Sequence, residues 1–256
     1  MNINLEKAKE EFLKYTENYD LEDENIKRKQ EHSLRVATIS KQIAEKMKLS
    51  QKEIALATLI GILHDIARFE QYVRFKNYNV LSDFDHGDYA VEILNQDIRK
   101  YIETDEHDEI IKKAIKNHNK YKIEEGLSAK EEFFAKIIRD ADKIDILYES
   151  TGIFWKNQEE KVNKSKLSEK IYNDVMKNKI IKIEKDRNYN TIDDMLITLA
   201  YTYDVNFKES YEIIQKENYI NKTIQRFNFE DAETKEKVMQ VINNLNKYIT
   251  NKIQES

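Results

Sequence analysis

Residues 50–67 read SQKEIALATLIGILHDIA, and this stretch decides the fold class. Ser50 followed three residues later by Glu53 is a capping box, a pattern that opens a helix. The residues that follow are apolar nearly all round the predicted helix, which is typical of a central buried helix. His64 and Asp65 stand at its C-terminal end, so two ionisable side chains terminate the most apolar segment of the chain.

The rest of the sequence also predicts an all-α protein. Its 256 residues include no proline and only four glycines, so helix breakers are scarce. Periodicity and capping patterns predict further helices at about 4–18, 24–47, 88–102, 107–119, 129–149, 191–203 and 229–253, and a loop region at 69–87. We expect a single α-helical domain over residues 1–256, with a core at about 25–150 and a C-terminal helical part at about 151–256 packed on it.

Composition and charge exclude several classes of protein. Hydrophobic residues make up 40% of the chain without a membrane-length apolar run, which argues against disorder and against membrane insertion. The 43 basic and 48 acidic residues are spread along the chain, whereas binding to a nucleic acid polymer needs a concentrated basic face. Cysteine is absent, which rules out disulfides and thiolate metal sites. The N-terminal stretch resembles no targeting peptide, so we expect a cytoplasmic protein; its oligomeric state is left open.

Histidines and aspartates recur on apolar helical faces. His32 shares one predicted face with Val36 and Ile39, and His118 and Asp142 also follow apolar residues at helical spacing. Any one of these residues alone is more often a satisfied core or surface residue. An ordered set is harder to explain by coincidence, because a buried carboxylate is costly unless it is paired or bound to a metal. Imidazole and carboxylate groups together are the ligands that divalent metals use, and the full set is His32, His64, Asp65, His86, His118 and Asp142.

Other polar residues have a simpler interpretation. His107 stands at a predicted helix start among acidic neighbours and is interpreted as a core or surface residue. Asp85 and Asp88 are interpreted as turn or N-cap residues. On its own, Asp142 has an alternative role as a structural ion-pair partner of Arg139 or Lys143.

The ordered set resembles the signature of the HD-domain superfamily of metal-dependent phosphohydrolases: a histidine, a His-Asp pair and a distant aspartate. The matching segments are EHSLRVA with His32, LIGILHDIARFEQ with His64 and Asp65, and IIRDADKIDIL with Asp142. The segments FDHGDYAVEIL and AIKNHN are similar to a bacterial subgroup with two further histidines, here His86 and His118. The resemblance covers residues 25–150 closely and, less specifically, the later segment TIDDMLITLAYTYDVNFKES.

This resemblance implies a helical bundle that holds one or two divalent metal ions, among which Mn, Fe, Co, Ni, Zn and Mg are all candidates. The first ion would be held by His32, His64, Asp65 and Asp142. In binuclear members Asp65 would bridge to a second ion held by His86 and His118, and two such ions clamp a phosphate and supply a hydroxide nucleophile. With a single ion, His86 or His118 would instead orient the substrate or protonate the leaving group.

Arg68 follows Asp65 by three residues, so its cation is expected near the site. It would bind an anionic substrate or offset charge in the transition state; the alternative is an ordinary charge at a helix end. Arg35, Arg139 and Lys143 are weaker candidates for the same role. The expected function is hydrolysis of a nucleotide or another small phosphorylated metabolite, with Asp65 and Arg68 as the catalytic residues and Arg68 also as a substrate-binding residue.

Three alternatives stay open or are disfavoured at this stage. An HD-type di-iron oxygenase acting on a small organic substrate resembles the same six-residue set, and ligands alone do not separate it from a hydrolase. A non-catalytic binding module is disfavoured because the ligand set is complete. A guanosine-tetraphosphate hydrolase would have an acidic pair shortly after His64-Asp65, where this chain has IARFE. The GYP motif typical of HD domains that act on cyclic dinucleotides is also absent from the sequence.

Overall fold

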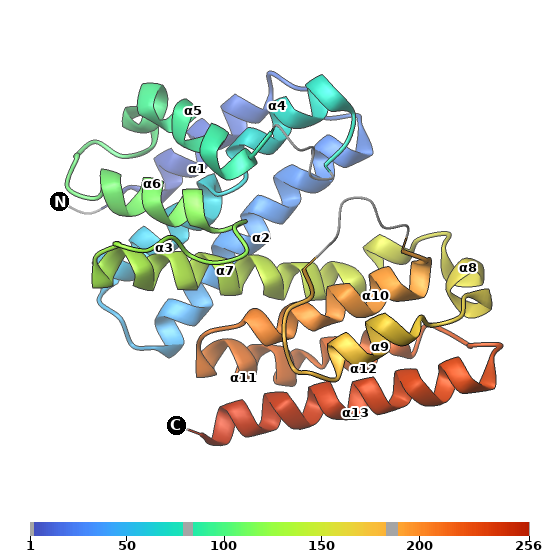
Figure 1. Cartoon of the computed structure of the whole chain (residues 1–256). Helices are drawn as coiled ribbons and strands as arrows, with labels where there is room; N and C mark the ends of the chain where they lie inside the picture. The colour runs from blue at the N-terminus through green and yellow to red at the C-terminus, as the bar shows by residue number, and fades with distance from the viewer. Residues whose placement is uncertain (1–2, 79–83, 183–188, 256) are drawn as a thin grey trace. The chain divides into compact units, whose positions relative to one another are not determined.

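The computed structural model describes residues 3–78, 84–182 and 189–255, and within these ranges all regular structure is helical (Figure 1). More than half of the residues lie in helices, which confirms the predicted all-α class. The chain forms two compact units, Met1–Asp142 and Lys143–Ser256. The expectation of one domain over the whole chain stays a prediction.

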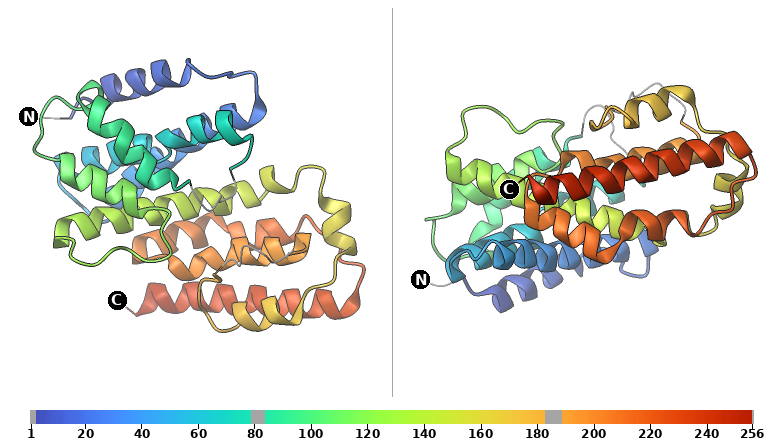
Figure 2. Two further views of the ribbon diagram at one scale, coloured as in Figure 1. Left: turned by 45° about the horizontal axis from the view of Figure 1, so that its top comes forward. Right: turned by 90° about the horizontal axis from the view of Figure 1, so that it is seen from below.

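The helices follow one another through the chain as labelled in Figure 1. Those that begin in the first unit are α1 (Leu5–Thr16), α2 (Glu24–Lys46), α3 (Gln51–Leu63), α4 (Ile66–Phe75), α5 (His86–Tyr101), α6 (Asp108–Asn117) and α7 (Ala129–Ser150). The second unit contains η1 (Ile153–Trp155), α8 (Glu159–Lys164), α9 (Glu169–Val175), α10 (Thr191–Leu199), η2 (Ala200–Asp204), α11 (Lys208–Glu217), α12 (Tyr219–Ile224) and α13 (Ala232–Gln254). The long helix α13, red in both views of Figure 2, packs along α11 and also contacts α9 and α12.

Capping side chains fix the starts of two helices that matter for the site. At α3 the Ser50 hydroxyl accepts a hydrogen bond from the Glu53 N–H (3.3 Å), and the Glu53 carboxylate accepts one from the Ser50 N–H (3.0 Å). Ser128 and Glu131 form the same reciprocal pair before α7, at 3.3 and 2.7 Å. Both predicted capping boxes are therefore present, and such a cap stabilises a helix by about 1 kcal/mol.

The expected loop at 69–87 is wrong at both of its ends. Helix α4 continues to Phe75 because Phe69 and Tyr72 extend a buried apolar face, and it ends where Lys76 adopts a left-handed φ of 49°. Helix α5 begins at His86, two residues earlier than predicted. Its N-cap is Asp85, whose carboxylate accepts hydrogen bonds from the N–H groups of Gly87 and Asp88. This confirms the N-cap role predicted for Asp85. Positions 79–83 of the expected loop lie outside the described residues.

Helix α3 is the central element of the first unit. All its residues from Leu56 to Leu63 are buried, and it contacts α1, α2 and α6. The closest approach to α2 is at Gly61, where a Cβ atom would lie 2.6 Å from the Cα of Ala37. Only glycine permits this approach of the two backbones. The packing matters for function because α2 carries His32 and α3 ends at His64.

In the part of the chain that the structure describes, no helix combines the length and the hydropathy needed to cross a bilayer.

Replacing Gly61 by Ala should destabilise the protein by roughly 1–3 kcal/mol, because the new methyl group overlaps backbone atoms that cannot rotate away. The free energy of unfolding from urea titration measures the effect. Gln51→Ala, at an exposed position of the same helix, is the control and should change it by less than about 0.5 kcal/mol. Equal stabilities of the two variants would contradict the close packing of α2 and α3.

Candidate metal centre

Six predicted site residues come from five helices and one helix junction of the first unit. His32 lies on α2, His64 is the C-cap of α3, and Asp65 lies between α3 and α4. The remaining three are the first residue of α5, the C-cap of α6 and a residue of α7, namely His86, His118 and Asp142. The structure brings all six together, and the side chain of Asp142 is the most exposed of the set, at 16%.

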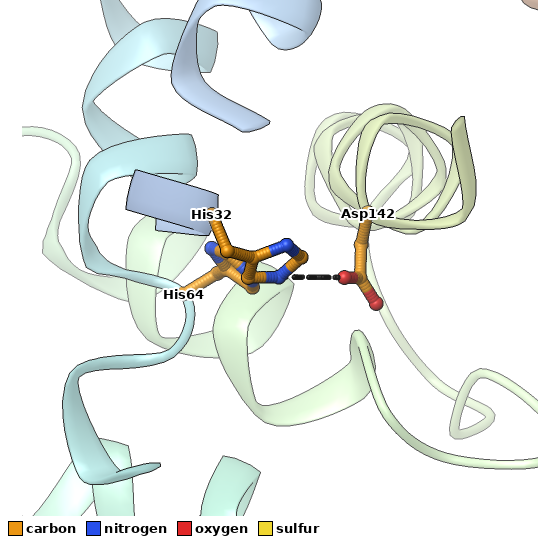
Figure 3. A group of neighbouring side chains, drawn as sticks. All are labelled: His32, His64 and Asp142. Carbon is orange, nitrogen blue, oxygen red and sulfur yellow. Dashed lines mark hydrogen bonds and ion pairs between the residues drawn. The ribbon is translucent and has the colours of Figure 1, made fainter. Parts of the chain in front are cut away.

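The first part of the cluster joins two imidazoles to two carboxylates. His32 Nε2 lies 3.1 Å from Asp142 Oδ1 and 3.5 Å from Asp65 Oδ2. His64 Nε2 lies 3.3 Å from His32 Nε2 and 3.6 Å from the same Asp65 oxygen. Figure 3 shows the rings of His32 and His64 next to each other, with the Asp142 carboxylate directed from α7 towards the His32 ring. The ligand atoms of His32, His64 and Asp142 therefore lie within 4.8 Å of one another, and Asp65 adjoins both imidazoles.

The second part of the cluster uses the other oxygen of Asp65. His118 Nε2 lies 3.4 Å and His86 Nε2 3.6 Å from Asp65 Oδ1, and these two nitrogens are 3.1 Å apart. One carboxylate oxygen thus faces one pair of histidines and the second oxygen faces another pair. This is the arrangement expected of a carboxylate that bridges two cations.

Backbone carbonyl groups fix the orientation of two of the rings. His64 Nδ1 lies 2.8 Å from the carbonyl oxygen of Gly61, and His118 Nδ1 lies 2.6 Å from that of Ile115. A carbonyl oxygen only accepts, so Nδ1 must carry the proton in both rings. The Nε2 atoms face the cluster, and in the neutral ring this tautomer leaves Nε2 as the nitrogen that can bind a metal.

The close approach of α5 and α6 places His86 beside His118. A Cβ atom at Gly87 would lie 2.6 Å from Asn119 Oδ1 and 2.8 Å from the carbonyl oxygen of Lys116, so this position requires glycine. Asn119 Nδ2 donates to Asp85 Oδ1 (2.9 Å) and lies 3.3 Å from His86 Nδ1. The glycine of the FDHG segment therefore permits the contact between the two ligand-bearing helix ends.

Arg139 and Lys143, two weaker candidates for binding phosphate, have structural partners. Arg139 is buried, and its Nη1 donates to the carbonyl oxygens of Asn117 (2.9 Å) and Lys120 (2.6 Å). It therefore holds the chain on both sides of His118. In the second unit, Lys143 forms an ion pair with Asp204 at 2.8 Å.

Charge compensation keeps both carboxylates ionised. Burial is the largest influence on the pKa of Asp65 and would raise it, but nearby positive charge, above all that of Lys29, holds that pKa well below its ordinary value. For Asp142, burial likewise opposes ionisation. The hydrogen bond with His32 and the charges nearby nevertheless lower the pKa of Asp142 below its ordinary value.

Burial keeps two of the histidines neutral. It lowers the pKa of His64 to about 4, although the neighbouring carboxylates act in the opposite direction. It also lowers the pKa of His86 well below its ordinary value, and Arg68 adds to this effect. At neutral pH these two imidazoles are therefore uncharged beside ionised carboxylates, the protonation states of metal ligands.

The donor set fits divalent cations. Ligand atoms about 2.1 Å from one ion, at tetrahedral or octahedral angles, lie roughly 3.0–3.4 Å apart. The nitrogen and oxygen atoms of the cluster lie 3.1–3.8 Å apart. Small movements of side chains therefore suffice to complete coordination by nitrogen and oxygen, which suits Mn, Fe, Co, Ni or Zn.

Two cations border the cluster, and sequence reasoning identified only one of them. Arg68 Nε lies 3.5 Å from Asp65 Oδ1, while its Nη1 donates to the carbonyl oxygen of Tyr78 at 2.7 Å. Lys29 was missed, although its Nζ lies only 2.9 Å from Asp65 Oδ2. The available signal was its position three residues before His32, which places both residues on one face of α2.

His107 lies apart from the cluster, as the sequence interpretation held. It is buried at the start of α6, and its nearest carboxylate is that of Glu106, at 3.9 Å. Among the described residues neither of its ring nitrogens has a hydrogen-bond partner, so it is a core residue whose hydrogen bonds are not satisfied there.

The metal-free protein should lose stability as the pH falls from 6.5 towards 4. In that range His64 is protonated in the unfolded chain but not in the folded one, so unfolding takes up a proton. Replacing His64 by Gln should reduce the slope of unfolding free energy against pH by about 1 kcal/mol per pH unit. Urea titrations of chelator-treated protein at pH 6.5, 5.5 and 4.5 would measure it, and identical slopes for wild type and variant would contradict burial of a neutral His64.

Comparison with known families identifies the region of the chain that contains the cluster. A model of the HD domain family matches residues 30–147, a range that includes all six residues of the cluster and ends before the C-terminal segment 191–210. Searches of curated proteins and of solved structures gave no match. HD domains bind divalent metals, and the buried His/Asp cluster fits such a site. Residues 30–147 therefore match the HD domain family, and this match supports the resemblance of that segment to the HD-domain superfamily.

Proposed function

We propose that this protein is a metal-dependent phosphohydrolase that acts on a nucleotide or another small phosphorylated metabolite. The observation that carries the proposal is the Asp65 carboxylate, which directs its two oxygens to two separate pairs of histidines and has a cation beside each oxygen. The match of residues 30–147 to the HD domain, which points to a superfamily of metal-dependent phosphohydrolases, agrees with it.

In this proposal the six residues divide into two ligand sets. His32, His64, Asp65 and Asp142 hold one ion, and Asp65 shares a second ion with His86 and His118. When bound, such ions polarise a phosphate and lower the pKa of coordinated water. Overall, an oxygen of water forms a bond to phosphorus, the ester P–O bond breaks, and the leaving oxygen takes up a proton.

The chain's own residues prepare the site for this reaction. Burial keeps His64 and His86 uncharged, so that they are ready to act as ligands without first losing a proton. The anchors at Gly61 and Ile115 direct the Nε2 atoms of their histidines inward, so that no reorientation is needed on binding. Arg68 places a positive charge beside Asp65, where it offsets negative charge that develops on phosphate oxygens.

A di-iron oxygenase remains the competing function, because a carboxylate-bridged pair of histidine sites suits iron as well. The cations bordering Asp65 favour an anionic substrate, and an anionic organic substrate would also satisfy them. The two functions differ in what they consume. A hydrolase releases phosphate without dioxygen, whereas an oxygenase takes up dioxygen and depends on iron.

Asp65→Asn should abolish phosphate release from the best substrate in a screen of nucleotides and sugar phosphates with Mn²⁺. The amide keeps the shape but removes the charge on which both ligand sets depend, so activity should fall by more than about 100-fold, the upper range for residues that only support a metal ligand. Asp97→Asn, a partly exposed residue paired with Lys100, is the matched control and should keep its activity. Chelator should remove the wild-type activity, and iron-dependent dioxygen uptake without phosphate release would overturn the proposal in favour of the oxygenase.

Metal content should distinguish the two ligand sets. Wild-type protein loaded with Mn²⁺ and freed of excess metal should carry two ions per chain, measured by mass spectrometry of the metal. His86→Ala and His118→Ala should each lose one ion and keep the other, whereas His64→Ala should lose the first ion, to which it is a ligand. If the wild type carries one ion and both of the former variants keep it, the centre is mononuclear, and His86 and His118 act on the substrate instead.

A further inference from the structure

Lys29 is the closest charged neighbour of the Asp65 carboxylate. Its Nζ lies 2.9 Å from Oδ2, nearer than any of the four imidazoles, and its side chain is only 13% exposed. Oδ2 is also the oxygen that faces His32 and His64. The ammonium group of Lys29 and the first metal ion would therefore compete for the lone pairs of Asp65 Oδ2.

Tyr78 holds this cation and two others at the edge of the centre. The Nζ of Lys29 lies 5.5 Å from the centre of the Tyr78 ring, and the Cζ atoms of Arg68 and Arg28 lie at 5.8 and 5.9 Å. These distances are within the range of cation–π attraction. The ring is itself fixed, because its hydroxyl group donates to the carbonyl oxygen of Asn25 (3.1 Å) and it stacks on Tyr72 with centres 4.9 Å apart.

We propose that Lys29 has two alternating partners: the Asp65 carboxylate in the metal-free protein and a phosphate oxygen of the substrate once metal is bound. The inference rests on the proposed function. A dication on Oδ2 would repel an ammonium group 2.9 Å from that oxygen and would take up the lone pairs that hold it. Lys29 then needs another anion, and the Tyr78 ring keeps it at the edge of the centre, where a bound phosphate would lie.

Arg68 is displaced by the same argument at the opposite oxygen of Asp65. Two side-chain cations therefore lose their shared carboxylate together when metal binds. Their two positive charges match the two negative charges of a phosphomonoester better than the single charge of a diester. The substrate class is accordingly a phosphomonoester or the terminal phosphate of a longer chain.

The test exploits two effects of opposite sign. In Lys29→Met, the metal-free protein lacks the cation that competes for Asp65, so calorimetric titration with Mn²⁺ should show the first ion binding about tenfold more tightly. In the Mn-loaded form, the same variant should bind inorganic phosphate about tenfold more weakly, because one charged hydrogen bond is lost. Binding of dimethyl phosphate, a diester anion, should be weak in both proteins and change by less than the phosphate affinity.

Lys41→Met is the matched control, since Lys41 lies on the same helix, is exposed, and forms an ion pair with Glu45 at the surface. It should leave both affinities unchanged. Circular dichroism checks that each variant is folded, and Lys29→Gln, with a polar side chain, takes the place of Lys29→Met if the latter does not fold.

If the Lys29–Asp65 ion pair is purely structural, the two affinities change in a different way. Loss of Mn²⁺ and phosphate affinity together, or no change in either, would overturn the role of Lys29. Absence of phosphate release from every substrate in the wild type would overturn the proposed function instead, and the two titrations would still decide whether Lys29 exchanges partners between Asp65 and an anion.

Discussion

The buried negative charge of Asp65 is the constraint on which the rest of the site depends. A carboxylate removed from water is unfavourable unless other groups compensate its charge. Here two cations and four imidazole nitrogens lie within 3.6 Å of its oxygens. Each oxygen has its own set of these partners, so the carboxylate is divided between two environments. That division is the geometry on which the proposal of a bridging carboxylate rests.

Close helix packing fixes the positions of the histidines that surround the Asp65 carboxylate. At Gly61 two backbones approach so closely that no side chain fits, and at Gly87 a helix start approaches the end of its neighbour in the same way. Both glycines lie within three residues of a histidine of the cluster. The ligands are thus positioned by rigid helices and their ends rather than by long loops, which favours a preorganised site.

The ligand atoms alone do not determine the reaction, because nitrogen and oxygen donors serve hydrolytic metals and iron alike. The bordering cations add information of a different kind. Lys29 and Arg68 satisfy Asp65 in the metal-free protein, yet a bound dication would compete with both for the same carboxylate. An anionic ligand resolves that competition, which is why the charge balance favours a phosphate ester over a neutral organic substrate.

Local sequence patterns determined the helices and the identity of the cluster. Several features depend only on neighbours within a few residues, so they could be predicted directly from the sequence. They are the absence of proline, the capping boxes at Ser50 and Ser128, and the apolar faces carrying His32, His118 and Asp142.

The extension of α4 to Phe75 was missed because burial of Phe69 and Tyr72 outweighs the weak local preference of that segment. Lys29 was missed because its partner Asp65 is 36 residues away, so its position three residues before His32 did not by itself identify the contact. The sequence by itself identified the six residues whose side chains the structure brings together. Only the tertiary structure decided that Asp65 faces both histidine pairs, since the directions of its two oxygens depend on how five helices pack.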